Sequence, residues 1–597
     1  MRAERGGMTE QRLEDLALIG NCQCSALVDR YGSVVWSCLP RFDSQPVFGQ
    51  LLDPQGGHFT IRPPERVAGE QRYLPNTNVV ETIFHTPEGS FRVIDFAPRW
   101  KHNGKNMRPS WLVRIIDPLS GSPRVSVECA PIEGWSKEQL KASLRGDTIV
   151  YEGRDDTLYL ATNVPLSYLD GRPFALTERR YMVLTDGERI TDELAPMCER
   201  LLHDTCAYWE TWVKHCNVPA QYQQQVIRSA LALKMHVFED TGAIVAAMTT
   251  SLPESPGAGR TWDYRYCWLR DAYYAIDAFR LLGHFEEREH FLEFLLTVAA
   301  STKDLDLQPL YRIDGKTDLE EVLLPHWAGY NGEGPVRIGN GAATHLQNDI
   351  FGEMVLALSP IFIDDRFHHE RTPATWSLLK RLTNKAIAAA GVPDAGIWEY
   401  RTEWVPQSFS TLMCWAAADR AATLAGRHEP ALVSELRGHA DRIQHELLDN
   451  AWSKKRGALM GTYGGETLDA AMLQAVVLRL LPAKDERLHQ TVDAIIKDLD
   501  HDGWILRYRA DDGFGVPQVA FIICFFWLIE ALAVLGRLDE ARMLLDRVVG
   551  VMPKLGLLSE DWDPKVGRLW GNFPQAYSHV GLIHAAFASS KPWAELL

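Results

Sequence analysis

The feature of this sequence that most constrains its fold is a series of twelve helix-like segments between residues 220 and 597. Within each segment the apolar residues recur about every 3.6 positions, which is the period of an α-helix. No convincing strand pattern interrupts them. The sequence therefore predicts an all-α region of twelve helices, at residues 222–238, 268–283, 285–302, 342–360, 374–391, 408–425, 429–452, 467–481, 484–498, 517–536, 538–553 and 572–589.

The connections between these helices alternate in length. Those from an odd to an even helix have about 14 to 39 residues, whereas those from an even to an odd helix have about 1 to 13. Because short links make successive helices antiparallel, all the long loops should emerge at the same end. We expect an (α/α)6 barrel with its long loops on one face. An α-solenoid is the alternative, but no repeat of about 20 to 50 residues supports it.

Two segments illustrate how the helices divide between an inner and an outer ring. Residues 517–536 are apolar almost all round, as a helix buried on several sides should be. Residues 429–452 are amphipathic, with one charged face. The even-numbered helices are therefore assigned to the inner ring and the odd-numbered helices to the outer ring.

The N-terminal part of the chain has a different pattern. From residue 15 to about 190, apolar and polar residues alternate with a period of two between tight turns, which indicates regularly spaced strands and a β-sandwich. A chain of 597 residues also exceeds one ordinary hydrophobic core. The sequence thus predicts a multidomain β + α protein, with an N-terminal β-sandwich domain over 1–189, a helical linker over 190–219 and an (α/α)6-barrel catalytic domain over 220–597.

Composition excludes several classes of partner. A net charge of −16 argues against a nucleic-acid partner, because the phosphate backbone requires basic patches. No stretch reaches about 18 apolar residues, and the N-terminus lacks the pattern of a leader peptide, so we expect a cytoplasmic protein that does not bind membranes. The ten cysteines show neither disulfide-framework density nor a repeated zinc-binding spacing. We expect no metal and no cofactor, and the sequence leaves a homo-oligomer possible.

Glu399 is the first candidate catalytic residue. It lies in the predicted long loop 392–407, between Trp398 and Tyr400. A carboxyl group against aromatic surface is poorly solvated in its charged form, as a general acid at neutral pH requires. The alternative is a solvated acidic turn.

A second acidic group lies in the loop 554–571, where Glu560, Asp561 and Asp563 fall within four residues. Their mutual repulsion suggests that one faces a site while the others cap or solvate the turn, and the spacing does not identify which one. Two carboxyl groups that face each other across a cleft are typical of glycoside hydrolysis. The location of both loops on one face of the barrel favours this chemistry.

Two further features suit a sugar-binding site. Arg270 and Asp271 are adjacent near the start of the second helix, either as a clamp on sugar hydroxyls or as a helix cap with a structural ion pair. Sugar rings also need flat aromatic platforms. Seven of the nineteen tryptophans fall in the long loops, namely Trp262, Trp327, Trp398, Trp404, Trp504, Trp562 and Trp570.

Five ordered motifs, taken together, resemble a known family over nearly the whole chain. They are LIGNCQCSALVDRYGSVVWSCLPRFDS, RTWDYRYCWLRDAYYAIDAF, GPVRIGNGAATHLQNDIFGE, PDAGIWEYR and SEDWDPKVGRLWGNFPQAYSHVGLI. They are similar to glycoside hydrolase family 15, in its prokaryotic glucoamylase and trehalase branch. The resemblance implies a β-sandwich followed by an (α/α)6 barrel, and the inverting hydrolysis of α-glucosidic bonds without a cofactor.

The resemblance also implies roles for individual residues. By analogy with the family, Glu399 is the general acid and Glu560 is the general base. Tyr264, Arg270 and Asp271 are expected to line the pocket for the terminal glucose. The predicted substrate-binding residues are Tyr264, Arg270, Asp271, Trp398, Arg507 with Arg509 as its rival, and Trp327 with Tyr330 as its alternative.

The function implied is that of an inverting, exo-acting α-glucosidase of glucoamylase type, which releases β-glucose from the non-reducing end of α-gluco-oligosaccharides. The alternatives are an α,α-trehalase, an inverting glycoside phosphorylase and a non-catalytic carbohydrate-binding protein. Phe409 and Thr411 stand where relatives often carry Tyr and Lys, beside the catalytic loops. The sequence therefore does not disclose which α-glucosidic linkage is cleaved.

Overall fold

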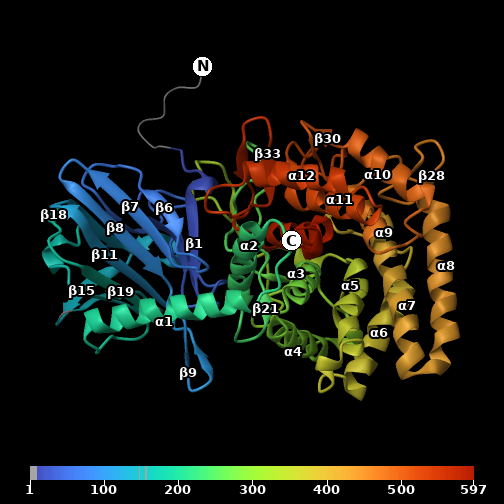
Figure 1. Cartoon of the computed structure of the whole chain (residues 1–597), viewed down its shortest axis with the longest axis horizontal. Coiled ribbons are helices and arrows are strands. Elements are labelled where there is room, and N and C mark those ends of the chain that lie inside the picture. Colours follow the sequence, from blue (N-terminus) through green and yellow to red (C-terminus); the bar gives the residue numbers. More distant parts are fainter. Residues whose placement is uncertain (1–9, 147, 155–156, 597) are drawn as a thin grey trace.

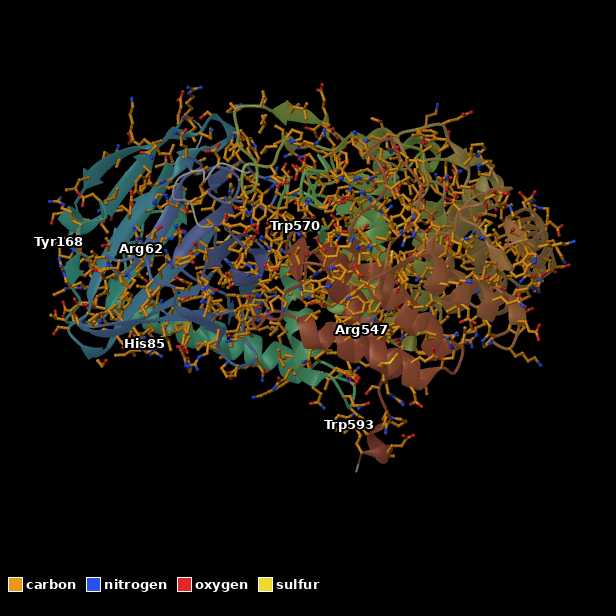
Figure 2. All side chains as sticks on the ribbon, turned by 90° about the horizontal axis from the view of Figure 1, so that it is seen from above. Arg62, His85, Tyr168, Arg547, Trp570 and Trp593 are labelled. Atoms are coloured by element: carbon orange, nitrogen blue, oxygen red, sulfur yellow. The ribbon has the colours of Figure 1, made fainter. Side chains whose placement is uncertain are left out.

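The computed structural model describes residues 10–146, 148–154 and 157–596, and it has a β-rich part beside a helical part (Figure 1). Seen from above, Arg62, His85 and Tyr168 lie on the β-rich part, and Arg547 lies on the helical part (Figure 2). The first nine residues of the predicted N-terminal domain lie outside the described residues. Among those described, no helix combines the length and the apolar character needed to span a bilayer.

The β-rich part contains two large antiparallel sheets, as predicted for a β-sandwich. The first has the order β1 (Leu16–Gly20), β2 (Ser25–Asp29), β3 (Ser33–Cys38), β5 (His58–Arg62), β12 (Arg124–Ala130) and β18 (Phe174–Ala175), with β4 (Pro46–Phe48) also paired to β3. The second has the order β15 (Lys141–Arg145), β16 (Thr148–Glu152), β17 (Thr157–Thr162), β19 (Arg180–Asp186), β11 (Trp111–Gly121), β8 (Gly89–Phe96), β7 (Val80–Thr86) and β6 (Glu70–Tyr73).

A buried ion pair joins the two sheets through their shared core. Arg114 of β11 is 1% exposed, and its Nε donates to Oδ1 of Asp95 on β8 at 2.7 Å. The same guanidinium donates to the carbonyl oxygens of Gly32, in the turn between β2 and β3, and of Phe59 in β5, so it reaches the first sheet. The charge is therefore compensated beside the apolar core that the two sheets share.

The outer face of the second sheet is covered by α1 (Leu194–Lys214), which occupies most of the predicted linker. Alternate residues of β11 point to this side, because successive side chains of a strand face opposite ways. Val113 and Ile115 pack there with Met197 and Leu201 of the helix. In Figure 1, α1 runs along the sheet toward the barrel.

The helical part is the predicted (α/α)6 barrel. Neighbouring inner helices contact each other and the last contacts the first, except that α7 meets the short 3-10 helix Ala470–Leu473, which leads directly into α9, so the inner ring closes. The inner helix α11 is buried without interruption from Ile522 to Leu532, whereas the outer α8 buries one residue per turn. The inner helices are α3 (Leu269–Leu282), α5 (Asp349–Leu358), α7 (Ser408–His428), α9 (Gln474–Val477), α11 (Ile522–Val534) and α13 (Ala576–Ser589), and the outer helices are α2 (Gln223–Met235), α4 (Glu286–Ser301), α6 (Pro373–Ala389), α8 (Val433–Ala451), α10 (Glu486–Asp498) and α12 (Leu538–Val551).

Two predictions about the barrel are wrong in detail. The inner helices predicted at 342–360 and 467–481 are shorter, since α5 begins at Asp349 and α9 ends at Val477. The long loops also contain short antiparallel strand pairs, although no strand was expected there. These loops are largely buried, so their backbone N–H and C=O groups need partners, which the short strand pairs supply.

The six long loops form a closed circle of backbone contacts at one end of the barrel. Each loop is paired to the next, which confirms the prediction that they share one face. The paired positions are Cys267 with Tyr311, Leu346 with Ala395, Gln407 with Thr462, Asp469 with Tyr508, Phe521 with Asp561, and Ala247 with Gln575.

The buried pair in the sandwich generates a stability prediction. Asp95→Ala leaves Arg114 charged and without its carboxylate in the core, so we expect a loss of about 3–5 kcal/mol in the free energy of unfolding. Asp117→Ala is the matched control, because its partner Arg92 on the same sheet is one-third exposed. We expect that control to cost at most about 1 kcal/mol. Denaturant unfolding followed by circular dichroism measures both, and equal losses would contradict the account.

Candidate active site

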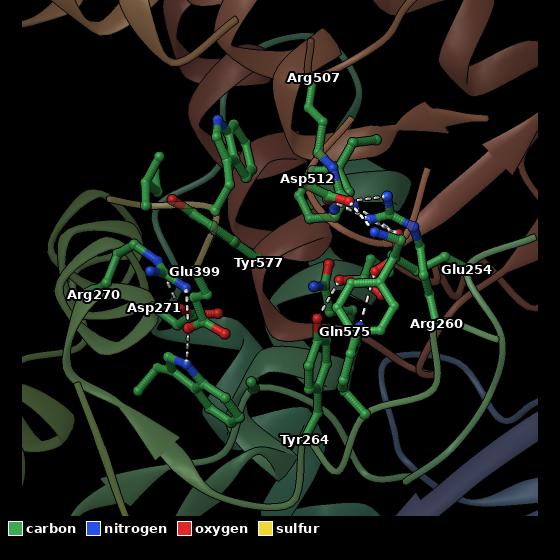
Figure 3. Close-up of a pocket in the computed structure, with 18 of the residues that line it drawn as sticks. Glu254, Arg260, Tyr264, Arg270, Asp271, Glu399, Arg507, Asp512, Gln575 and Tyr577 are labelled. Atoms are coloured by element: carbon green, nitrogen blue, oxygen red, sulfur yellow. Dashed lines mark hydrogen bonds and ion pairs between the residues drawn. The ribbon is translucent and has the colours of Figure 1, made fainter. Parts of the chain in front are cut away.

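A cavity of about 760 Å³, including the space at its open mouth, lies among the long loops of the barrel. Figure 3 shows Glu399 with Arg270 and Asp271 at the left of this cavity, Arg507 at the top and Tyr264 at the bottom. Seven of the eight predicted site residues line it: Tyr264, Arg270, Asp271, Trp398, Glu399, Arg507 and Glu560.

Glu399 sits on a strained turn in the loop between α6 and α7. Its φ angle is +60°, a left-handed conformation that costs a residue with a side chain about 1–3 kcal/mol. Three donors surround its Oε1 atom: the indole Nε1 of Trp268 at 2.7 Å, Nε2 of Gln347 at 3.2 Å and Nη2 of Arg270 at 3.6 Å. These donors would stabilise the carboxylate that forms when Glu399 gives up a proton.

Glu560 directly precedes β33 (Asp561–Asp563) and is only 1% exposed. The hydroxyl of Tyr264 donates to its Oε1 at 2.7 Å, whereas Oε2 has no hydrogen-bond partner among the described residues. Gly571, with a φ of +76°, packs directly against this side chain. A Cβ atom at Gly571 would lie 2.6 Å from Cβ of Glu560, so only glycine leaves the carboxylate in its place.

One aromatic pair links the two carboxylates. The rings of Tyr264 and Trp268 meet edge to face with their centroids 5.3 Å apart. Since the hydroxyl of Tyr264 holds Glu560 and the indole of Trp268 holds Glu399, the two carboxyl groups are anchored by neighbouring side chains of a single loop.

The electrostatic surroundings of Glu560 favour its protonated form. Burial, together with the negative charge of Glu254, raises the pKa of Glu560 to about 8. The hydroxyl of Tyr264 and the charge of Arg507 act in the opposite direction. A general base acts in its deprotonated form. The fraction of Glu560 that can act as a base should therefore change with pH near neutrality.

The neighbouring acids differ from expectation. Asp563 accepts from the backbone N–H of Lys565 at 2.9 Å and caps the turn, as predicted for the acids that do not face the site. Asp561 was expected to be solvated in the same way, but it is 2% exposed and does not line the cavity. The pairing of β33 with strands on both sides encloses it, and burial raises the pKa of Asp561 well above its usual value.

Arg270 and Asp271 lie in the first turn of α3, on the floor of the cavity. Nε of Arg270 is 3.3 Å from Oδ2 of Asp271, and a second nitrogen donates to Gln347 at 3.1 Å. Burial raises the pKa of Asp271 to about 6, although the charge of Arg270 opposes this shift. The pair is therefore both a structural ion pair and part of the cavity lining, which combines the two interpretations that the sequence left open.

Arg507 and Trp398 form the opposite wall. Nη2 of Arg507 donates to Glu254 at 2.8 Å, and its guanidinium lies 5.8 Å from the Trp398 ring centroid. The indole of Trp398 donates to Asp469 at 2.8 Å, which fixes the ring. Arg509, the rival of Arg507, is exposed and does not line the cavity.

Trp327 is not brought to the cavity, which contradicts its predicted role. Its ring is 3% exposed and packs edge to face on Trp135 of the N-terminal part, 5.2 Å between centroids. The indole donates to the carbonyl oxygen of that same residue at 2.9 Å. Tyr330, the alternative to Trp327, is also buried elsewhere, with its hydroxyl donating to Gln11. Both rings join the barrel loops to the N-terminal part.

The sequence did not single out several residues that line the cavity. Trp268, Gln575 and Tyr577 lie inside the quoted motifs, so their position in those motifs was the available signal. Glu254 carries no such signal, because it is an isolated acid in a proline-rich stretch. Only the folded loop brings it beside Arg507.

The arrangement offers one carboxyl group surrounded by donors and another that is buried with one free oxygen atom. Together they can serve proton transfer on both sides of a bond. Within the described residues, no group of three or more His, Cys, Asp or Glu side chains could hold a metal ion.

Comparisons with known proteins identify the family of the chain. The sequence profile described as glycosyl hydrolases family 15 matches residues 220–587, and the one described as trehalase-like, N-terminal matches residues 3–165. The trehalase of Mycolicibacterium smegmatis is 35% identical, over 96% of this chain and 90% of the relative. The trehalase of Mycobacterium tuberculosis is 34% identical, over 96% of this chain and 89% of the relative.

Among solved structures, that of a bacterial glucoamylase complexed with acarbose is similar to the whole chain. The TM-score is 0.68, and the match covers 97% of this chain and 94% of the other. With 14% sequence identity, this likeness shows the fold, a β-sandwich followed by a helical barrel.

The surroundings of Glu560 generate a prediction about pH. If Glu560 acts as a base, the kcat/KM for glycoside hydrolysis should rise with pH through its pKa. Glu254→Gln removes a negative charge that raises this pKa, so the acidic limb of the profile should move to lower pH. Measuring kcat/KM from pH 4 to 9 checks the direction. A limb that stays in place or moves to higher pH would contradict the assignment.

Proposed function

Because this chain belongs to glycosyl hydrolases family 15 and is a glycoside hydrolase of α-glucosides, we propose that it is an inverting α,α-trehalase. The observation that carries the proposal is the similarity to trehalases at 34–35% identity over 96% of the chain. From the sequence alone, a glucoamylase-type activity was the first expectation and trehalase the alternative. The relatives favour the alternative, because the two reported above are trehalases and the N-terminal part matches the trehalase-like profile.

In the proposed reaction, one glucose of trehalose is bound at the floor of the cavity. There Arg270 and Asp271 face the sugar hydroxyls from one side, and Arg507 faces them from the other. The second glucose, which is the leaving group, lies toward the mouth. The carboxyl group of Glu399 donates its proton to the glycosidic oxygen, and the carboxylate left behind is stabilised by Trp268 and Arg270.

The second half of the reaction takes place at Glu560. A water molecule attacks the anomeric carbon from the face opposite to the leaving group, and Glu560 accepts one proton from that water. The carboxylate of Glu560 retains acceptor capacity for this proton, because only its Oε1 has a hydrogen-bond partner among the described residues. The bond between carbon and the glycosidic oxygen breaks as the bond to water forms. The products are two glucose molecules, and the attacked carbon inverts.

A substrate panel tests the proposed function. Trehalose, maltose, maltotriose, isomaltose and soluble starch are each incubated with the enzyme, and the glucose released is measured. We expect kcat/KM for trehalose to exceed that for every other substrate. Faster hydrolysis of maltotriose or starch would contradict the proposal and would favour the glucoamylase-type function instead.

Two variants test the assigned catalytic roles, and a third serves as their control. Glu399→Gln and Glu560→Gln should each lower kcat for trehalose by about 10²- to 10⁴-fold, the usual contribution of a positioned acid or base. Asp563→Asn, three residues from Glu560, should retain wild-type kcat because Asp563 caps a turn outside the cavity. An equal loss in all three variants would contradict the assigned roles.

A further inference from the structure

One of the charged side chains that line the cavity is more exposed than those at its floor. Arg401 lines the cavity, and its side chain is 31% exposed, whereas that of Arg270 on the floor is 10% exposed. Arg401 follows Glu399 by two residues in the same loop. Its backbone is therefore close to that of the general acid, while its guanidinium reaches Trp262 and Phe514, which belong to other loops of the cavity.

The guanidinium of Arg401 packs over two aromatic rings. Its guanidinium carbon lies 4.5 Å from the ring centroid of Trp262 and 5.5 Å from that of Phe514. Both rings also line the cavity. Trp262 is fixed in turn by its indole, which donates to Glu254 at 3.1 Å.

An ion pair outside the cavity holds the same side chain. Nη2 of Arg401 lies 2.9 Å from Oε2 of Glu321, which does not line the cavity. Glu321 also accepts from Arg337 at 2.7 Å and from the backbone N–H of Gly341 at 3.0 Å. Burial acts against the charge on Glu321, but these donors outweigh it and hold its pKa below the usual value.

These contacts join four of the six long loops. Trp262 comes from the loop between α2 and α3, Glu321 and Arg337 from that between α4 and α5, Arg401 from that between α6 and α7, and Phe514 from that between α10 and α11. The two cation–π contacts and the ion pair act on the same guanidinium and add to one another. Several such contacts restrict the Arg401 side chain to one position in the lining of the cavity.

We propose that Arg401, held by Glu321 over Trp262 and Phe514, ends the cavity after the second glucose and so restricts the enzyme to disaccharides. This inference rests on the proposed trehalase function. The two rings of trehalose are both terminal, so neither needs to extend past Arg401. Any further sugar on the leaving glucose has to pass through the space that the guanidinium occupies.

The test compares two substrates with the same scissile bond. One is trehalose, and the other is a trisaccharide in which one ring of trehalose carries a further α-1,4-linked glucose. Hydrolysis of the α,α-1,1 bond releases glucose from the first and glucose plus maltose from the second. The measured quantity is kcat/KM for trehalose divided by kcat/KM for the trisaccharide.

In Arg401→Ala the wall is removed, and we expect this ratio to fall at least about tenfold through faster cleavage of the trisaccharide. Glu321→Gln leaves the cavity lining intact but releases Arg401, so it should lower the ratio in the same direction by a smaller factor. The matched control is Arg366→Ala. Arg366 likewise pairs with an acid, Asp364, and lies over a ring, Phe285 at 3.8 Å, but in the link between α5 and α6 at the opposite end of the barrel.

Three results would overturn the inference. They are an unchanged ratio in Arg401→Ala, a ratio that falls only because trehalose is cleaved more slowly, and a shift in Arg366→Ala as large as that in Arg401→Ala. A wild-type enzyme that fails to cleave trehalose would instead refute the proposed function. The two failures are therefore distinguishable in one set of assays.

Discussion

The edge-to-face contact between Tyr264 and Trp268 is the interaction on which the site depends. Each ring ends in a donor, and the two donors hold the carboxyl groups of Glu560 and Glu399. The two glutamates lie in different loops of the barrel, so their own backbones do not fix their separation. The loop before α3 fixes it, because both rings belong to that loop.

The N-terminal β-sandwich supports this loop from outside the barrel. The indole of Trp36 donates to the carbonyl oxygen of Met248 at 2.8 Å, and Arg265 donates to that of Ser44 at 2.7 Å. Trp327, in the loop between α4 and α5, attaches the neighbouring loop to the N-terminal part through Trp135. The sandwich is therefore part of the structure that positions the catalytic groups, which accords with similarity to trehalases that extends over both parts.

Much of the architecture could be predicted from the sequence, because loop lengths and apolar periodicity report directly on helix direction and burial. The closed circle of long loops follows from that alternation. Details inside the loops could not be predicted in this way. The burial of Asp561 arises from strand pairing between distant loops, and the position of Trp327 arises from contact with another part of the chain. Glu254 acquires its importance only from the arginine that folding places beside it.

The central claim is that two carboxyl groups act on opposite faces of one sugar in a single displacement. Proton NMR of the glucose formed from trehalose, recorded before the anomers interconvert, tests it most directly. The account predicts equal amounts of α- and β-glucose at the start, since the attacked ring inverts and the leaving ring keeps its configuration. Initial release of α-glucose alone would contradict it.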